Sequence, residues 1–176
     1  TKSKVSQVFG QIIAGMSISQ AAYYGNLGEE KKACDAWNYF QRGTGKVLNT
    51  SESLGELYTN FADYENFADT NLLVRLGEWM EMSHLILQSE KKFRQKSFYL
   101  EDLKTFLIRF DQTHLTDHEL SMFADLQKLV QPIKEFNAQA ALGNKQNTEA
   151  ALLIKESKIK ELLYNVLRNF YQIEKE

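Results

Sequence analysis

Apolar residues recur three and four positions apart along most of this chain, which is the spacing of one face of an α-helix. Proline, which breaks helices, occurs once, at Pro132. A helical period with almost no helix breakers is typical of an all-α protein. The sequence therefore predicts a single all-α domain over residues 1–176, a bundle of about six helices joined by short connections as successive antiparallel hairpins.

Helix boundaries can be placed from the apolar stripes together with capping residues. Thr116-Asp117-His118-Glu119 has the form of a capping box, in which a Thr and a Glu side chain each accept a backbone N–H. Pro132 falls inside the stripe that follows and should kink or divide that helix. The expected helices run over residues 3–24, from Glu29 to Gly43, from a cap at Thr50 or Ser51, over residues 72–92, 100–110 and 117–143, and from Thr148 onward.

The second expected helix places Trp37 on its inner face, together with Ala33, Ala36 and Phe40. Small residues beside the indole would let the first helix approach closely, while the ring fills the space between the two helices. We therefore expect Trp37 to be a main anchor of the core.

Charge and hydropathy limit the classes of partner. The chain has 21 Lys and Arg against 23 Asp and Glu, a net charge of −2, so no overall field would attract nucleic acid or an anionic membrane surface. Its longest apolar runs, such as residues 85–87, are far shorter than the roughly 20 residues that span a bilayer. We expect a soluble protein with no membrane span, and no nucleic-acid partner unless the chain is a ribonuclease.

The single cysteine, Cys34, excludes an intrachain disulfide and a zinc cluster built from thiolates. A chain without disulfides is typical of a reducing compartment, so we expect a cytoplasmic location. The chain begins with Thr1 rather than Met, which leaves room for a preceding segment.

Charge is distributed unevenly along the sequence. Residues 52–81 contain seven acidic residues and one basic residue, a net charge of −6, whereas residues 88–109 have a net charge of +3. If these are not merely two solvated faces, they predict complementary surfaces that pair between protomers or attract a partner.

The helix expected over residues 72–92 carries two candidate ligand sites. Glu81 and His84 have the Glu-x-x-His spacing of di-metal helical bundles, but such a centre needs a second copy of the pair. We therefore predict no metal and no cofactor, with a solvent-facing Glu81 and a half-buried His84. Trp79, Met80 and Met82 could instead line a pocket for a small molecule.

Aromatic residues are plentiful in the first half of the chain, and Tyr23, Tyr39 and Tyr64 lie off the predicted stripes. Exposed aromatic side chains are common anchors of protein-binding surfaces. We therefore expect a non-enzymatic interaction or scaffold module that binds another protein, or itself as a homo-oligomer, through these residues.

The enzymatic alternative rests on Arg109 and His114, whose Arg-x4-His spacing resembles the motif of HEPN ribonucleases, small all-α domains that usually dimerise. The resemblance implies metal-independent RNA cleavage, in which the guanidinium stabilises the phosphate charge and the imidazole transfers protons. It covers six residues, and Phe110 follows the arginine where many of these motifs have a polar residue.

Overall fold

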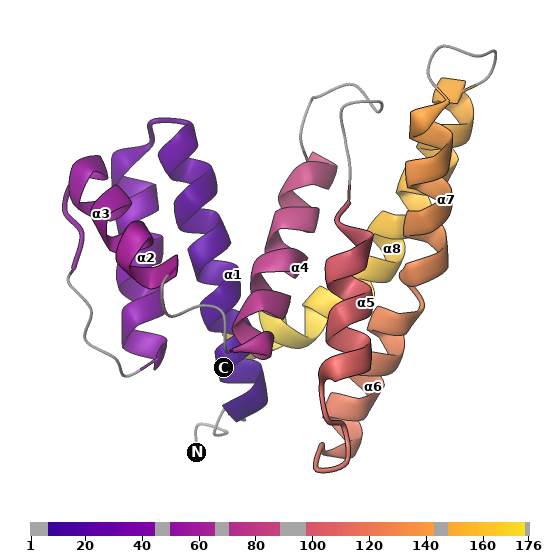
Figure 1. Ribbon diagram of the computed structural model, residues 1–176, viewed down its shortest axis with the longest axis horizontal. Helices are drawn as coiled ribbons and strands as arrows, with labels where there is room; N and C mark the ends of the chain where they lie inside the picture. The colour runs from indigo at the N-terminus through magenta and orange to yellow at the C-terminus, as the bar shows by residue number, and fades with distance from the viewer. Residues whose placement is uncertain (1–6, 45–49, 66–70, 89–97, 143–147, 175–176) are drawn as a thin grey trace. The chain divides into compact units, whose positions relative to one another are not determined.

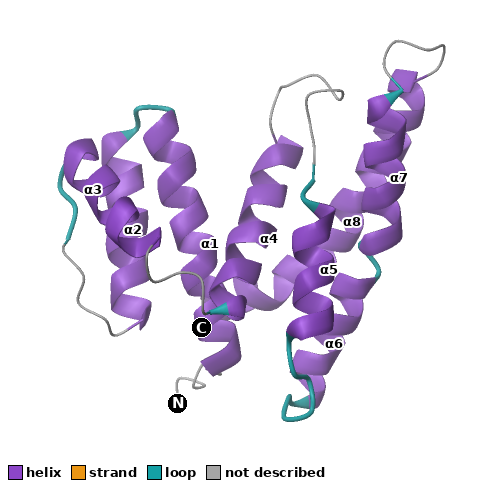
Figure 2. Ribbon diagram, in the orientation of Figure 1, coloured by secondary structure: helices purple, strands orange, loops and turns teal. Residues whose placement is uncertain are grey.

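The computed structural model of the chain describes residues 7–44, 50–65, 71–88, 98–142 and 148–174. Every regular element in this part of the chain is an α-helix (Figure 2), so the all-α prediction is confirmed. The described residues form eight helices, α1 (Gln7–Asn26), α2 (Glu30–Thr44), α3 (Leu54–Glu65), α4 (Leu72–Gln88), α5 (Leu100–Arg109), α6 (Asp117–Gln127), α7 (Val130–Ala141) and α8 (Thr148–Glu174) (Figure 1).

Contacts divide the chain into two compact units, residues 1–82 and residues 83–176, and the boundary falls within α4. We call them unit 1 and unit 2. The single domain expected from the sequence stays a prediction. No helix of the described residues combines the length and apolar character needed to cross a membrane.

In unit 1, α1 and α2 form a helical hairpin whose turn depends on Gly28. This residue has a φ of 74°, a left-handed conformation that glycine adopts without strain. The turn is closed by the Glu29 N–H, which donates to the Tyr24 carbonyl at 2.9 Å.

The core of unit 1 forms where α1 and α2 meet α3 and α4. Trp37 is fully buried there, as predicted, and its ring centre lies 5.4 Å from that of Phe40 and 5.3 Å from that of Phe61. The buried cluster comprises Ala14, Ile18, Ala21, Ala33, Trp37, Phe40, Leu57 and Val74.

Helices α1 and α4 cross at two glycines, Gly15 and Gly77. A Cβ atom on Gly15 would overlap the carbonyl oxygen of Val74, and one on Gly77 would overlap that of Ile12. Beside the crossing, the Ser19 hydroxyl donates a hydrogen bond to the Glu78 carbonyl at 2.8 Å. The two backbones therefore approach as closely as only glycine permits.

In unit 2, two predicted boundaries are confirmed. The Thr116 side chain accepts the N–H of Glu119 at 3.2 Å, and the Glu119 carboxylate accepts the N–H of Thr116 at 3.0 Å, so the capping box is complete. The apolar stripe that follows is divided near Pro132, as predicted: α6 ends at Gln127 and α7 begins at Val130. A proline ring clashes with the carbonyl four residues earlier, here that of Lys128 in the break.

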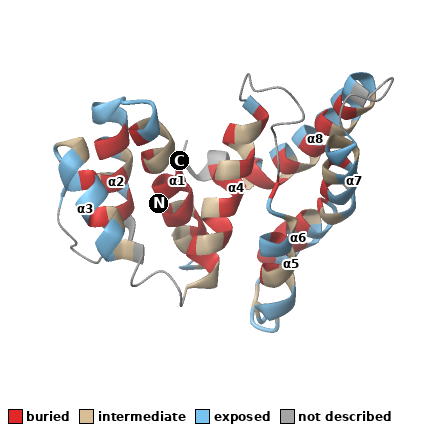
Figure 3. Ribbon diagram, turned by 45° about the horizontal axis from the view of Figure 1, so that its top comes forward, coloured by how far each residue is buried: buried red, intermediate tan, exposed pale blue. Residues whose placement is uncertain are grey.

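The core of unit 2 combines residues from α5, α6, α7 and α8. Buried positions recur along one face of each of these helices (Figure 3). Ahead of α5, the backbone of Phe98 is held by the side-chain amide of Asn137 in α7, which accepts its N–H at 3.4 Å and donates to its carbonyl at 2.9 Å. The largest fully buried side chains of this core include Leu103, Phe123, Leu126, Phe136 and Phe170.

Candidate functional site

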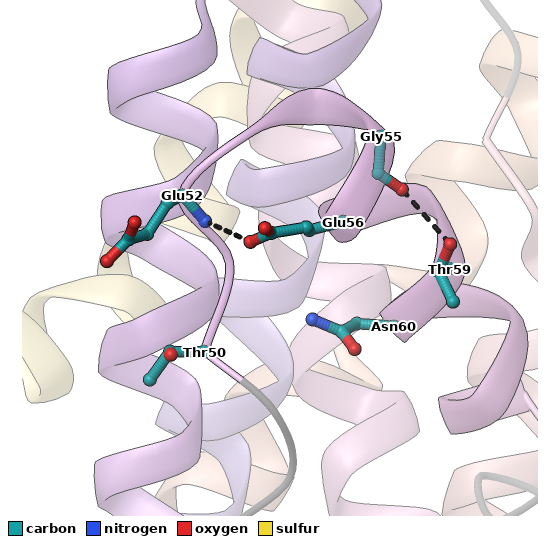
Figure 4. Close-up of a pocket in the computed structure, with 6 residues that line it drawn as sticks. All are labelled: Thr50, Glu52, Gly55, Glu56, Thr59 and Asn60. Atoms are coloured by element: carbon teal, nitrogen blue, oxygen red, sulfur yellow. Dashed lines mark hydrogen bonds between the residues drawn. The ribbon is translucent and has the colours of Figure 1, made fainter.

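An open polar pocket of about 640 Å³ lies at the start of α3 in unit 1 (Figure 4). The segment before α3 and the first two turns of that helix provide its wall. The lining residues carry carboxylates, hydroxyls and an amide, and they are Thr50, Glu52, Gly55, Glu56, Thr59 and Asn60.

The local sequence explains how α3 starts beside this pocket. Ser53 is the residue that caps the helix, because its hydroxyl accepts the N–H of Glu56 at 3.2 Å. The cap predicted at Thr50 or Ser51 was therefore two to three residues too early. The Glu56 carboxylate in turn accepts the N–H of Glu52 at 2.9 Å, a bond drawn in Figure 4.

Ser51 is buried instead of capping the helix, and it holds the segment ahead of α3 in place. Its backbone N–H donates to Asn38 Oδ1 at 3.0 Å, and its carbonyl accepts from Asn38 Nδ2 at 3.1 Å. The Ser51 hydroxyl accepts a hydrogen bond from Asn60 Nδ2 at 2.7 Å. These bonds join the pocket wall to both α2 and α3.

The surroundings of the pocket are acidic in sequence. Residues 47–74 contain five acidic residues and no Lys, Arg or His. Three of the five, Glu52, Glu56 and Asp63, are exposed on or next to α3. Carboxylates, hydroxyls and an amide oxygen accept hydrogen bonds, so the pocket suits an ammonium or a guanidinium group.

The three tyrosines expected to bind a partner are not brought together in one exposed patch. Tyr39 is half exposed on α2, and Tyr23 is partly buried with its ring edge against Tyr24. The ring of Tyr64 packs against Trp37, and its hydroxyl bonds to Glu78 Oε1 at 3.2 Å. A binding role for these residues stays a prediction.

Arg109 and His114, the residues of the ribonuclease alternative, are both exposed and lie within five residues of each other at the connection from α5 to α6. Phe110 between them stacks on Phe123, with ring centres 5.2 Å apart. This packing explains why an apolar residue follows the arginine. The ribonuclease alternative stays a prediction.

The other ligand sites expected on α4 do not coincide with the described pocket. Trp79 and Met80 are buried, and neither lines it. Glu81, expected to face solvent, is also buried, whereas His84 is half-buried as expected. The described residues contain no group of three or more His, Cys, Asp or Glu side chains that could hold a metal ion.

The basic counterpart of the acidic stretch lies mostly outside the described residues, because Lys91, Lys92, Arg94 and Lys96 fall in the segment 89–97. The acidic stretch was predicted from the sequence, whereas the pocket was not. The sequence signal at the pocket is the Ser-x-x-Glu pattern of Ser53 and Glu56, which indicates the start of a helix.

Comparison of the chain with protein-family models, with curated proteins and with solved structures gave no match.

Proposed function

We propose that this chain is a helical protein-binding module, and that its pocket at the start of α3 takes a basic side chain of a partner protein. The observation that carries the proposal is an open pocket of about 640 Å³, walled by Glu52 and Glu56, in a stretch of sequence without a basic residue.

Two properties of the pocket support this proposal. Its wall is fixed by the hydrogen bonds of Ser51 to Asn38 and Asn60, so little ordering is needed when a ligand binds. Its negative charge also has no basic side chain within residues 47–74 to neutralise it. A cationic side chain entering the pocket would gain charge-assisted hydrogen bonds, which contribute about 1.5–3 kcal/mol each.

Isothermal titration calorimetry with a hexa-arginine peptide tests the proposal, with a hexaglutamate peptide as the reference. We expect the basic peptide alone to bind, with an affinity that falls as salt is added. The double variant Glu52→Gln/Glu56→Gln keeps amide oxygens in place of the carboxylates, and it should bind at least about tenfold more weakly.

The matched control is Glu101→Gln/Asp102→Asn, which removes two exposed acidic groups from α5 in unit 2. This control should bind the peptide like the unmodified chain. Equal weakening in both double variants would mean that net charge alone attracts the peptide, and it would rule out the pocket as the binding site.

A further inference from the structure

The outward face of α8 carries large apolar side chains in contact with solvent. Leu153 is 55% exposed, Ile154 is 71% exposed and Tyr164 is 60% exposed, whereas Ile159 and Leu163 of the same helix are buried. Exposed and buried positions therefore form two separate faces of α8. Exposed apolar groups gathered on one face mark an interaction surface.

The positions of these residues fit a second copy of the same face. In an antiparallel pair of α8 helices with a two-fold axis at Ile159, Tyr164 of one copy lies opposite Ile154 of the other, because Ile159 is midway between them. The tyrosine ring would then cover Leu153 and Ile154 of the other copy. Ser157, exposed and small, lies near the axis and permits close approach of the helices.

Charges along one edge of this face favour the same arrangement. Lys158 and Glu161 are exposed, and within the helix their charged atoms are 3.9 Å apart. In the antiparallel pair, Lys158 of one copy is level with position 160 of the other copy. Glu161 of that copy is one residue further on, about 1.5 Å along the helix axis.

We propose that the outward face of α8 binds a second copy of this chain, forming an antiparallel homodimer about a two-fold axis at Ile159. The contact involves one helix face, from Leu153 to Tyr164, so it lies at the small end of specific interfaces. The dimer should therefore dissociate on dilution. The pocket at α3 takes no part in it, so the two proposals can fail separately.

Sedimentation equilibrium over a range of chain concentrations measures the dimer directly. We expect Ile154→Glu and Tyr164→Glu each to leave the chain monomeric, since each buries an unpaired charge in the interface. The matched control is Ile108→Glu on α5, where the side chain is 82% exposed, and it should dimerise normally. Circular dichroism should show unchanged helix content in all three variants.

Charge reversal tests the antiparallel arrangement. Lys158→Glu or Glu161→Lys alone should weaken the dimer at least about fivefold, and the double variant K158E/E161K should restore it. Three results would overturn the proposal: a monomeric chain at concentrations up to about 200 µM, a dimer that tolerates both Ile154→Glu and Tyr164→Glu, or no recovery in the charge-swapped double variant.

Discussion

At the scale of single residues, Trp37 is the largest fully buried side chain in the core of unit 1, and its ring contacts those of Phe40 on α2 and Phe61 on α3. Trp37→Ala should lower the free energy of unfolding by about 3–5 kcal/mol, the usual cost of removing a large aromatic side chain from a core. Tyr39→Ala on the same helix removes a half-exposed ring and should cost no more than about 0.5 kcal/mol. Urea denaturation of both variants checks the contrast, and similar midpoints would contradict it.

His84 should make the stability depend on pH. Burial lowers the pKa of its imidazole from the ordinary 6.5, so the folded state keeps it neutral where the unfolded chain takes up a proton. The stabilisation by the neutral side chain is therefore fully present above about pH 6.5. As the pH falls below that value, the free energy of unfolding decreases by at most about 1.4 kcal/mol per pH unit.

The variant His84→Gln should lose less stability between about pH 7.5 and about pH 5.5 than the unmodified chain. The unmodified chain, measured alongside, is the reference. Urea unfolding at the two pH values measures both. An undiminished loss in His84→Gln would show that this imidazole does not contribute.

At the scale of elements, the crossing of α1 and α4 determines how closely unit 1 can pack. Gly15→Ala and Gly77→Ala should each cost at least about 1–3 kcal/mol, because the new methyl group would overlap a backbone carbonyl of the other helix. Gly10→Ala lies in the same α1 helix with no atom within 4 Å of the added Cβ. It should instead stabilise the protein by about 0.5–1 kcal/mol. In thermal unfolding, Gly15→Ala and Gly77→Ala should lower the Tm, whereas Gly10→Ala should raise it. Shifts of the Tm in the same direction for all three variants would contradict the close crossing of α1 and α4.

In each unit, the side chain of an asparagine forms hydrogen bonds to the backbone of a residue that precedes a helix. Asn38 of α2 pairs with both backbone groups of Ser51 ahead of α3, and Asn137 of α7 pairs in the same way with Phe98 ahead of α5. A side-chain amide carries an acceptor oxygen and a donor NH2 group side by side, which match the N–H and the carbonyl of a single residue. The pairing of Asn38 with Ser51 fixes the segment that forms the pocket wall.

Elements whose signals are local in the sequence were predicted correctly. The capping box at Thr116 and the break at Pro132 depend on residues within four positions, and both were predicted. The cap of α3 was misplaced because Thr50, Ser51 and Ser53 are all capping residues, and the choice among them depends on Asn38 of another helix.

The candidate site also depends on contacts between residues far apart in the sequence. The acidic stretch was visible in the sequence, but the pocket was not, since Ser51 is held by a residue 13 positions away. Tyr64 seemed to lie off the stripe of α3, yet it contacts Trp37 on α2 and Glu78 on α4. A helix packed on two sides buries a wider arc than a single apolar stripe indicates.

At the scale of the whole molecule, the two proposed interactions belong to different units. The pocket at α3 lies in unit 1, and the outward face of α8 lies in unit 2. They share no residue, so a substitution in one leaves the other intact. A chain that both dimerises and binds a basic partner would present two pockets per dimer, which increases the apparent affinity for a partner with two basic segments.

We propose above all that a basic side chain of a partner protein enters the pocket at the start of α3. The most direct measurement is a two-dimensional NMR titration of the isotope-labelled chain with hexa-arginine, following every backbone amide. We predict that the largest shifts fall within residues 50–60, where the pocket-lining groups lie, and that they vanish in Glu52→Gln/Glu56→Gln. Shifts centred on unit 2, or shifts of the same size in the double variant, would contradict binding in the pocket.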